Sequence, residues 1–239
     1  MTAPLVAELR YWPELARLVR DARFRAPARA GGRVPVLLIP GFMAGDASLG
    51  ILHGWLRRRG HEVQRSRITM NVDCAGRALD RLDALLGDAG QPVVVIGQSR
   101  GGTLARALAA RRPEAVAGVM SLGSPVLDPL AVAPAVMRTV RSVARLGDLG
   151  VPGVFSTRCS GGDCCAEFNA LLRAPLDPEL PAVAIYSRSD AIVDWRACLD
   201  PYADCVEVKG SHTGMAVNPQ VYGTLERLLD RSEEVACSR

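Results

Sequence analysis

Val93-Val94-Val95-Ile96-Gly97-Gln98-Ser99-Arg100-Gly101-Gly102-Thr103-Leu104-Ala105 is the stretch that decides the fold. Its first four residues are apolar and β-branched, which predicts a buried strand that turns sharply into a helix. The glycines two positions before and after Ser99 remove side chains that would collide with the neighbouring strand or helix. The pattern therefore predicts a nucleophilic serine exposed at a helix N-terminus, and the alternative is an ordinary strand-to-helix turn.

The alternation of strand and helix continues on both sides of this turn. Apolar runs predict buried strands at residues 34–40, 116–123 and 181–186, and weaker patterns predict strands at 61–68 and 205–208. Helices are predicted at residues 46–59, 73–86, 100–112 and 220–229. This rhythm is typical of an α/β fold with a mostly parallel sheet and helices on both faces.

The rhythm breaks between residues 126 and 181. Val132, Val136, Val140 and Val143 form one apolar stripe that predicts a helix, and a loop rich in Gly, Pro, Ser and Cys follows it. A second, short helix is expected at 166–172. We interpret this insertion as a helical lid over a substrate pocket, and the alternative is a pair of helices that simply cover the sheet.

The residues before the first strand have a different character. Leu9, Trp12, Leu15 and Leu18 recur at near-helical spacing with arginines between them. This pattern predicts an amphipathic helix docked on the rest of the protein, and the alternative is a basic helix that lies on a membrane surface. Together with a linker at 25–33, it divides the chain into an N-terminal helix and linker (1–33) and an α/β domain (34–239).

The composition argues against several classes of protein. The formal net charge is +4 and the arginines are interleaved with Asp and Glu, so no nucleic-acid partner is expected. No apolar run reaches the length of a membrane span, and the first residues lack the pattern of a signal peptide. We therefore expect a cytoplasmic protein, with peripheral membrane contact through the N-terminal helix as the alternative.

Seven cysteines are present, an odd number that rules out complete pairing within the chain. Cys198 and Cys205 flank a short loop and could form a disulfide. Cys159, Cys164 and Cys165 cluster in the sequence, but neither group has the paired spacing of a zinc site. The sequence therefore predicts no metal site, and it predicts no cofactor.

The chain has three histidines, of which one lies where a catalytic base could act. His212 follows the last predicted strand in a loop of Gly, Ser and Thr, whereas His53 and His61 are expected to be surface or packing residues. Asp190 follows the preceding strand, where its carboxylate could accept the imidazole N–H and fix the tautomer. Asp194 is the alternative acid. The chain order is therefore serine, aspartate, histidine.

Two backbone N–H groups are candidates to stabilise an oxyanion. The first predicted strand ends in Pro40-Gly41-Phe42, and Gly41 would let the backbone turn so that the Phe42 N–H points toward the serine. The second candidate is the N–H of Arg100, the residue after the nucleophile. The alternative is an ordinary loop between a strand and a helix.

The chain resembles the α/β-hydrolase fold family, and within it the small bacterial lipases and esterases. The resemblance rests on Pro40-Gly41-Phe42, Gly97-Gln98-Ser99-Arg100-Gly101-Gly102, Ser187-x-x-Asp190-x-Ile192-Val193 and Ser211-His212-x-Gly214, and it runs from about residue 34 to the C-terminus. It implies that Ser99 is the nucleophile, Asp190 the acid and His212 the base. The chain departs from many lipases at Pro40, where they have a histidine, and its lid has no recognisable substrate signature.

The resemblance implies hydrolysis of a carboxylic ester through an acyl-enzyme on Ser99. The apolar lid suggests a lipid-like or hydrophobic acyl group. An acyltransferase or a thioesterase would use the same machinery, because fold and triad do not fix the acceptor. A scaffold that binds a lipid or a partner without catalysis is the alternative from another class.

Overall fold

The computed structural model describes residues 5–27 and 34–238, and within them it contains one six-stranded sheet. All five strand pairs are parallel, and the strand order is β2-β1-β3-β4-β5-β6. The strands are β1 (Val36–Ile39), β2 (Val63–Arg65), β3 (Val93–Gln98), β4 (Val116–Leu122), β5 (Ala182–Tyr186) and β6 (Asp204–Glu207). The predicted α/β fold is confirmed.

Successive residues of the central strands point to opposite faces of the sheet, and both faces are buried. In β3, Val94 and Ile96 join one hydrophobic cluster whereas Val93 and Val95 join the other. A strand buried on both sides needs apolar residues at every position, which explains the unbroken apolar run that predicted it.

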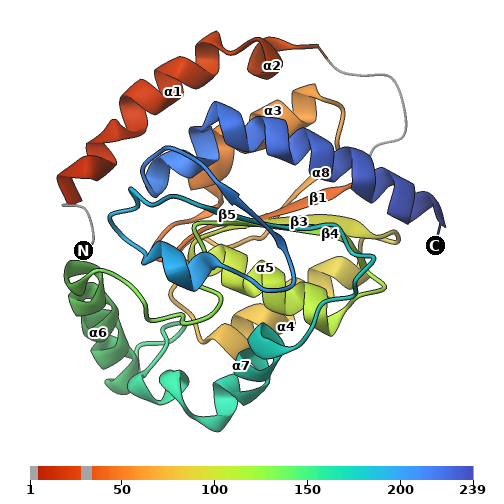
Figure 1. The fold of residues 1–239 in the computed structure, drawn as a ribbon. Helices are drawn as coiled ribbons and strands as arrows, with labels where there is room; N and C mark the ends of the chain where they lie inside the picture. The colour runs from red at the N-terminus through yellow and green to blue at the C-terminus, as the bar shows by residue number, and fades with distance from the viewer. Residues whose placement is uncertain (1–4, 28–33, 239) are drawn as a thin grey trace.

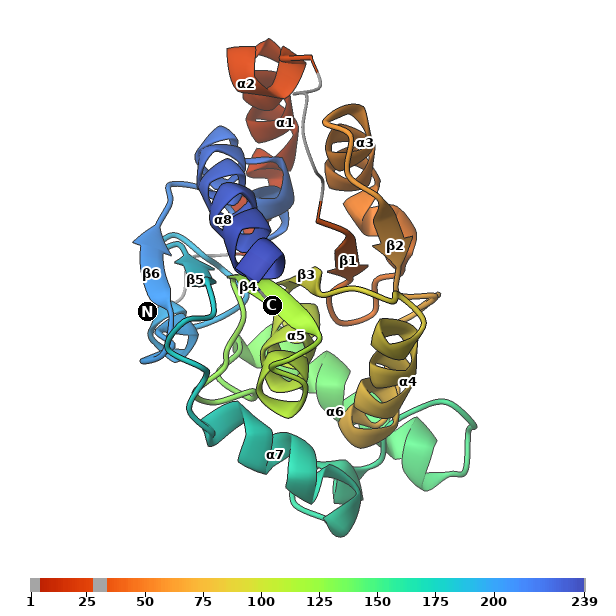
Figure 2. The same cartoon turned by 90° about the vertical axis from the view of Figure 1, so that its right-hand side faces the viewer.

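Helices cover the sheet on both faces (Figures 1 and 2). One face carries α3 (Gly50–Arg58) and α8 (Pro219–Ser238), with α1 (Tyr11–Arg20) and α2 (Ala22–Arg25) packed outside them. The opposite face carries α4 (Ala75–Gly87), α5 (Arg100–Arg111) and α7 (Ala166–Arg173). Each layer therefore buries one hydrophobic cluster against the sheet.

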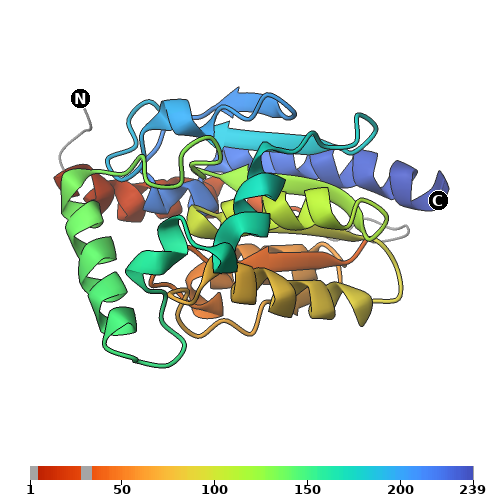
Figure 3. The same ribbon diagram turned by 90° about the horizontal axis from the view of Figure 1, so that it is seen from below.

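The insertion between β4 and β5 contains two helices that differ in their packing. Phe168 and Leu172 of α7 are buried in the cluster shared with α4 and α5, so α7 is part of the helical layer. By contrast, α6 (Pro134–Asp148) lies at one end of the molecule, as Figure 3 shows, and Ala144 is its one buried residue. The role of the insertion as a lid remains a prediction.

The N-terminal segment packs on the rest of the protein. Leu18 of α1 is fully buried in the same cluster as Trp55 of α3 and Tyr222 of α8. The segment begins with a short 3₁₀ helix, η1 (Leu5–Arg10). Part of the predicted linker, residues 28–33, lies outside the described residues. None of the described helices has an apolar stretch long enough to span a bilayer.

Candidate active site

Ser99 occupies a strained turn between β3 and α5. Its backbone dihedrals are φ 53° and ψ −124°, a region that side-chain-bearing residues rarely adopt. The Ser99 N–H donates to the Leu122 carbonyl at 2.7 Å, which fixes the turn to the end of β4. The residue is half-buried and stands at the N-terminus of α5, where the helix favours a developing negative charge.

The glycines around Ser99 have the steric role that the sequence predicted for them. A Cβ at Gly97 would overlap the backbone of Gly101, and a Cβ at Gly101 would overlap the carbonyl of Ile39 in β1. These are backbone contacts that cannot shift cheaply. The turn therefore requires glycine at both positions.

Asp190 and His212 form a buried pair at the same edge of the sheet. Asp190 Oδ2 lies 2.6 Å from His212 Nδ1, and each residue is only 4% exposed. The other oxygen, Oδ1, accepts the backbone N–H groups of Ile192 and Val193 at 2.8 Å each. Since a carboxylate can only accept, the pair places an imidazole proton on Nδ1, and in the neutral ring Nε2 then carries the lone pair.

The alternative acid, Asp194, lies elsewhere. Its carboxylate accepts the backbone N–H of Arg196 and pairs with the guanidinium of that same residue, and its side chain is 44% exposed. It is the N-cap of a short 3₁₀ helix rather than a partner of His212. The geometry therefore favours Asp190 over Asp194 as the residue that orients the imidazole.

Gly123 lies beneath the imidazole ring. This residue ends the turn after β4 with φ +57°, and a Cβ on it would come 3.0 Å from both His212 Nδ1 and Met215 Sδ. On the other side, the Gln98 side chain donates to the His212 carbonyl at 3.1 Å. The residue next to the candidate nucleophile thus holds the histidine loop directly.

The two candidate oxyanion donors both lie beside Ser99. A Cβ on Gly41 would come within 3.4 Å of the Ser99 Cβ, so the loop that carries Phe42 touches the nucleophile turn. Neither the Phe42 nor the Arg100 backbone N–H donates a hydrogen bond to another of the described residues. Their geometry toward a substrate oxygen remains a prediction.

Two glutamates of the N-terminal segment, which the sequence analysis missed, hold the loops of the candidate site. Glu14 of α1 is 4% exposed and accepts hydrogen bonds from the Ser211 N–H at 2.8 Å and hydroxyl at 2.7 Å. Glu8 accepts the N–H groups of His212 at 3.1 Å and Thr213 at 2.9 Å. A signal for Glu14 was present, because it shares the apolar helix face of Leu15 and Leu18, where a charge needs a buried partner.

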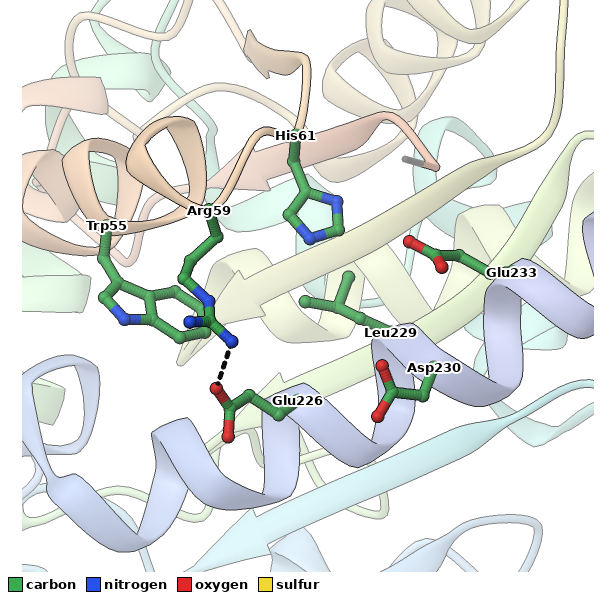
Figure 4. Close-up of a pocket in the computed structure, with 7 residues that line it drawn as sticks. All are labelled: Trp55, Arg59, His61, Glu226, Leu229, Asp230 and Glu233. Carbon is green, nitrogen blue, oxygen red and sulfur yellow. Dashed lines mark hydrogen bonds and ion pairs between the residues drawn. The ribbon is translucent and has the colours of Figure 1, made fainter. Parts of the chain in front are cut away.

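The other histidines lie away from this site, as the sequence predicted. Figure 4 shows His61 in a hollow between α3 and α8, together with the ion pair between Arg59 and Glu226 at 2.8 Å. The Nδ1 atom of His61 is hydrogen-bonded to the Val34 carbonyl at 3.0 Å. His53 is half-buried on α3, and burial lowers its pKa, as do the neighbouring arginines.

An apolar cluster adjoins the loop of the predicted oxyanion donor. The Phe42 ring lies 6.1 Å from the ring of Phe155, which packs with Val72 and with Ala144 of α6. The guanidinium of Arg100 lies over the Phe155 ring at 5.4 Å. The insertion therefore contributes apolar side chains that pack next to the nucleophile turn.

The cysteines are arranged differently from the sequence-based expectation. Cys198 and Cys205 are free thiols, and burial and then the charge of Asp190 raise the pKa of the Cys198 thiol. Cys159, Cys164 and Cys165 come together with Cys74, and their four sulfur atoms all lie within 4.8 Å of one another. The expectation of no metal site rested on spacing along the chain, which does not connect Cys74 to the other three, and it stays a prediction.

Comparisons with known proteins agree with this architecture. A family model described as the alpha/beta hydrolase fold matches residues 69–158. A search of curated proteins found no match. Among solved structures, the Bacillus licheniformis lipase BlEst2 is 14% identical with a TM-score of 0.62, over 85% of this chain and 96% of that one.

Two further structures show the same fold. Alpha/beta hydrolase domain-containing protein 10 from mouse is 18% identical with a TM-score of 0.60, covering 85% of this chain and 92% of the other. A thermophilic esterase from Thermogutta terrifontis is 18% identical with a TM-score of 0.56, covering 87% and 92%. The chain therefore has the α/β-hydrolase fold, with esterases and lipases among its structural neighbours, and this fold supports a hydrolase.

Proposed function

We propose that this protein hydrolyses carboxylic esters with hydrophobic acyl groups through Ser99, His212 and Asp190. The observation that carries the proposal is the buried Asp190–His212 pair at 2.6 Å, at the same sheet edge as a serine held at φ 53°. This combination supplies a half-buried nucleophile at a helix N-terminus and an imidazole whose free nitrogen can take its proton.

The reaction follows from these groups. His212 Nε2 takes the hydroxyl proton as Ser99 Oγ forms a bond to the ester carbonyl carbon, and the N–H groups of Phe42 and Arg100 stabilise the oxyanion. His212 then gives the proton to the leaving alcohol as the C–O bond breaks. Water, deprotonated by the same nitrogen, releases the acid from the acyl-enzyme and restores Ser99.

The apolar cluster supports a hydrophobic acyl group. Phe42 is half-buried and packs against the buried ring of Phe155 beside the nucleophile turn, so an acyl chain that covered the exposed part of Phe42 would remove apolar area from water. The guanidinium of Arg100 over Phe155 already donates to Asn71 Oδ1 and to the Asp73 backbone carbonyl, so we do not expect it to bind an anionic substrate group. We therefore expect activity to rise with acyl chain length.

A series of p-nitrophenyl esters of increasing acyl length, with Ser99→Ala as control, tests the proposal. Hydrolysis that rises with chain length and disappears in the variant supports it. Activity on short esters alone would contradict the hydrophobic acyl assignment and leave a carboxylesterase. Acyl transfer to an added alcohol in preference to water would instead favour an acyltransferase, and faster cleavage of thioesters would favour a thioesterase. A folded protein that neither cleaves esters nor reacts with a fluorophosphonate would favour a non-catalytic scaffold.

We also propose that α1 contacts an anionic lipid surface. With α1 docked through Glu14 and Leu18, Trp12 and Val19 of α1 are exposed at 70% and 51%, and Leu9 of η1 is exposed at 70%. Exposed arginines lie near these apolar side chains in the same segment: Arg10, Arg17 and Arg20. An apolar strip next to cationic side chains matches the chemistry of an anionic interface.

A further inference from the structure

Four cysteine sulfurs from two distant segments converge beside the nucleophile turn. Cys74 directly precedes α4, whereas Cys159 lies in the 3₁₀ helix η3 (Thr157–Ser160) and Cys164 and Cys165 lie in η4 (Asp163–Cys165). All four sulfurs lie within 4.8 Å of one another. The arrangement is one of the places where the insertion meets the α/β core.

The spacing of the sulfurs fits tetrahedral coordination. With a zinc–sulfur bond of about 2.3 Å, the sulfurs of a tetrahedral site lie about 3.8 Å apart. Cys74 and Cys165 lie 3.5 Å apart, Cys159 and Cys164 lie 3.7 Å apart, and Cys164 and Cys165 lie 3.9 Å apart. We infer that Cys74, Cys159, Cys164 and Cys165 bind one Zn²⁺ ion as a structural tetrathiolate site.

Groups near the four sulfurs can balance the negative charge of a zinc tetrathiolate site. Four thiolates and one Zn²⁺ carry a net charge of −2, so the site needs nearby donors and cations. Cys74 is the N-cap residue of α4, where the helix N-terminus favours a negatively charged thiolate. The guanidinium groups of Arg77 and Arg100 interact electrostatically with the cysteine sulfurs.

Close packing holds the segment around Cys74 against the insertion, so that the four sulfurs stay near one another. A Cβ on Gly76 would overlap the carbonyl oxygen of Cys164, so the insertion lies directly against the first turn of α4. The Phe155 N–H also donates to the Val72 carbonyl at 2.7 Å. The insertion therefore contacts the core both before and after Cys74 along the chain.

The ion would stabilise the insertion and the support of the candidate active site together. Arg100, the residue after Ser99, donates its side chain to the Asp73 carbonyl, next to Cys74, and to Asn71 Oδ1 at 3.0 Å. Asn71 in turn donates to the Pro40 carbonyl at 2.7 Å, just before the loop of the predicted oxyanion donor. Holding Cys74 in place therefore also holds Asn71 and Asp73, which contact the Ser99 turn and the loop that carries Phe42. The metal assignment itself does not depend on the proposed esterase activity.

Metal binding by the full-length protein tests the inference. Protein purified under reducing conditions is stripped with a chelator and titrated with Zn²⁺, and separately with Co²⁺. We expect one ion per chain, a Co²⁺ spectrum with strong thiolate charge-transfer and tetrahedral d–d bands, and a higher Tm with metal because the ion binds the folded state. Binding releases protons from the thiols, which an unbuffered titration would record.

Substitutions within and outside the cluster make the test specific. Cys164 is exposed, so Cys164→Ser removes a ligand with little effect on packing, and Cys159→Ser is a second variant at a half-buried position. Both should lose the charge-transfer bands and the metal-dependent rise in Tm. Cys205→Ser, at an exposed cysteine outside the cluster, should keep both.

Three results would overturn the inference. One is a wild-type protein without thiolate bands after Co²⁺ addition. Another is equal loss of metal in Cys205→Ser and Cys164→Ser. The third is mass mapping of the zinc-treated protein that finds disulfides among the four cysteines, which would make them two disulfide bonds instead of a metal site.

Discussion

At the scale of single residues, the site combines Ser99, whose backbone is strained, with the hydrogen-bonded pair of Asp190 and His212. A serine at φ 53° costs of order 1–3 kcal/mol, which the surrounding structure must offset. Asp190, by contrast, has both carboxylate oxygens engaged, with three N–H donors at 2.6–2.8 Å. The strain holds the hydroxyl outward while the satisfied carboxylate holds the imidazole, so the two features have complementary roles.

Ser99→Ala should abolish ester hydrolysis. We expect kcat/KM to fall by about 10⁴-fold or more, because the remaining groups can bind and polarise a substrate but cannot form the acyl-enzyme. The Tm should change little, since alanine keeps the same backbone and none of the described residues donates to the Ser99 hydroxyl to support the turn. Steady-state kinetics and a melting curve on the same preparation measure both. Retained activity with an intact fold would place the nucleophile elsewhere.

Asp190→Asn and Asp194→Asn form a matched pair. The first removes the acceptor that holds the Nδ1 proton of His212, so kcat should fall by roughly 10²–10⁴-fold. The second weakens a half-exposed cap of a short 3₁₀ helix and should leave kcat within about threefold, with a stability cost near 1 kcal/mol. Comparable kcat losses in the two variants would show that the assignment of Asp190 as the acid is wrong.

Gly123→Ala should disturb the histidine more than the fold. The new Cβ would press on His212 Nδ1, and a 1 Å misplacement of a catalytic group can reduce kcat by about 10²-fold. Gly90→Ala is the control, because Gly90 also has a positive φ, of +68°, but has no heavy atom within 4 Å of an added Cβ. Both variants should lose about 1 kcal/mol of stability from backbone strain. Only Gly123→Ala should lose kcat, and equal kinetics in the two variants would argue against this role.

At the scale of elements, the N-terminal helix supports the site as well as covering the sheet. Glu14 of α1 and Glu8 of the preceding η1 reach loops that follow β5 and β6, about 200 residues away in the sequence: Glu8 contacts Ala191, His212 and Thr213, and Glu14 contacts Ser211. A charged acceptor that satisfies several backbone donors at once fixes a loop that would otherwise be mobile. The segment that the sequence separates from the α/β domain therefore takes part in positioning His212, the candidate base.

Glu14→Ala should lower both stability and kcat. Loss of a charged acceptor from two buried donors should destabilise the fold by about 2–4 kcal/mol. It should also lower kcat while KM stays nearly constant, because the base and not the substrate loses its support. Arg17→Ala, an exposed change on the same helix, should alter neither. Urea unfolding and steady-state kinetics together measure this, and a Glu14→Ala variant with unchanged kcat would reduce α1 to a covering helix.

The strands and the nucleophile turn could be predicted because their signals are local. Alternating burial on two faces produces the apolar run of β3, and backbone contacts at Gly97 and Gly101 impose the glycine spacing. The Asp190–His212 pair follows from placing both residues after neighbouring parallel strands. The expected strand at 61–68 shortened to β2, which lies at the sheet edge and pairs on one side only, with β1.

Contacts between segments far apart in the chain could not be predicted in this way. Cys74 lies 85 or more positions before the other three cysteines of the cluster, so no short spacing motif connects them. The buried ion pair of Arg106 with Asp200, at 3.1 Å, likewise joins α5 to the residues before β6. In both cases the residue types were visible, and only the fold brings them together.

At the scale of the whole molecule, the exposed face of α1 predicts that the protein binds the surface of an anionic lipid membrane. Sedimentation with vesicles should show binding to those rich in anionic lipid and little binding to neutral ones, with release by salt, because each arginine near such a surface contributes about 1 kcal/mol. Trp12→Ala should weaken this binding severalfold, since it removes the largest exposed apolar side chain of the strip. Leu146→Ala, an exposed apolar residue of α6 at 48%, is the control and should bind as the wild type does. If Leu146→Ala weakened binding and Trp12→Ala did not, the membrane-facing element would be the insertion, and the lid would then be the part that reaches the lipid.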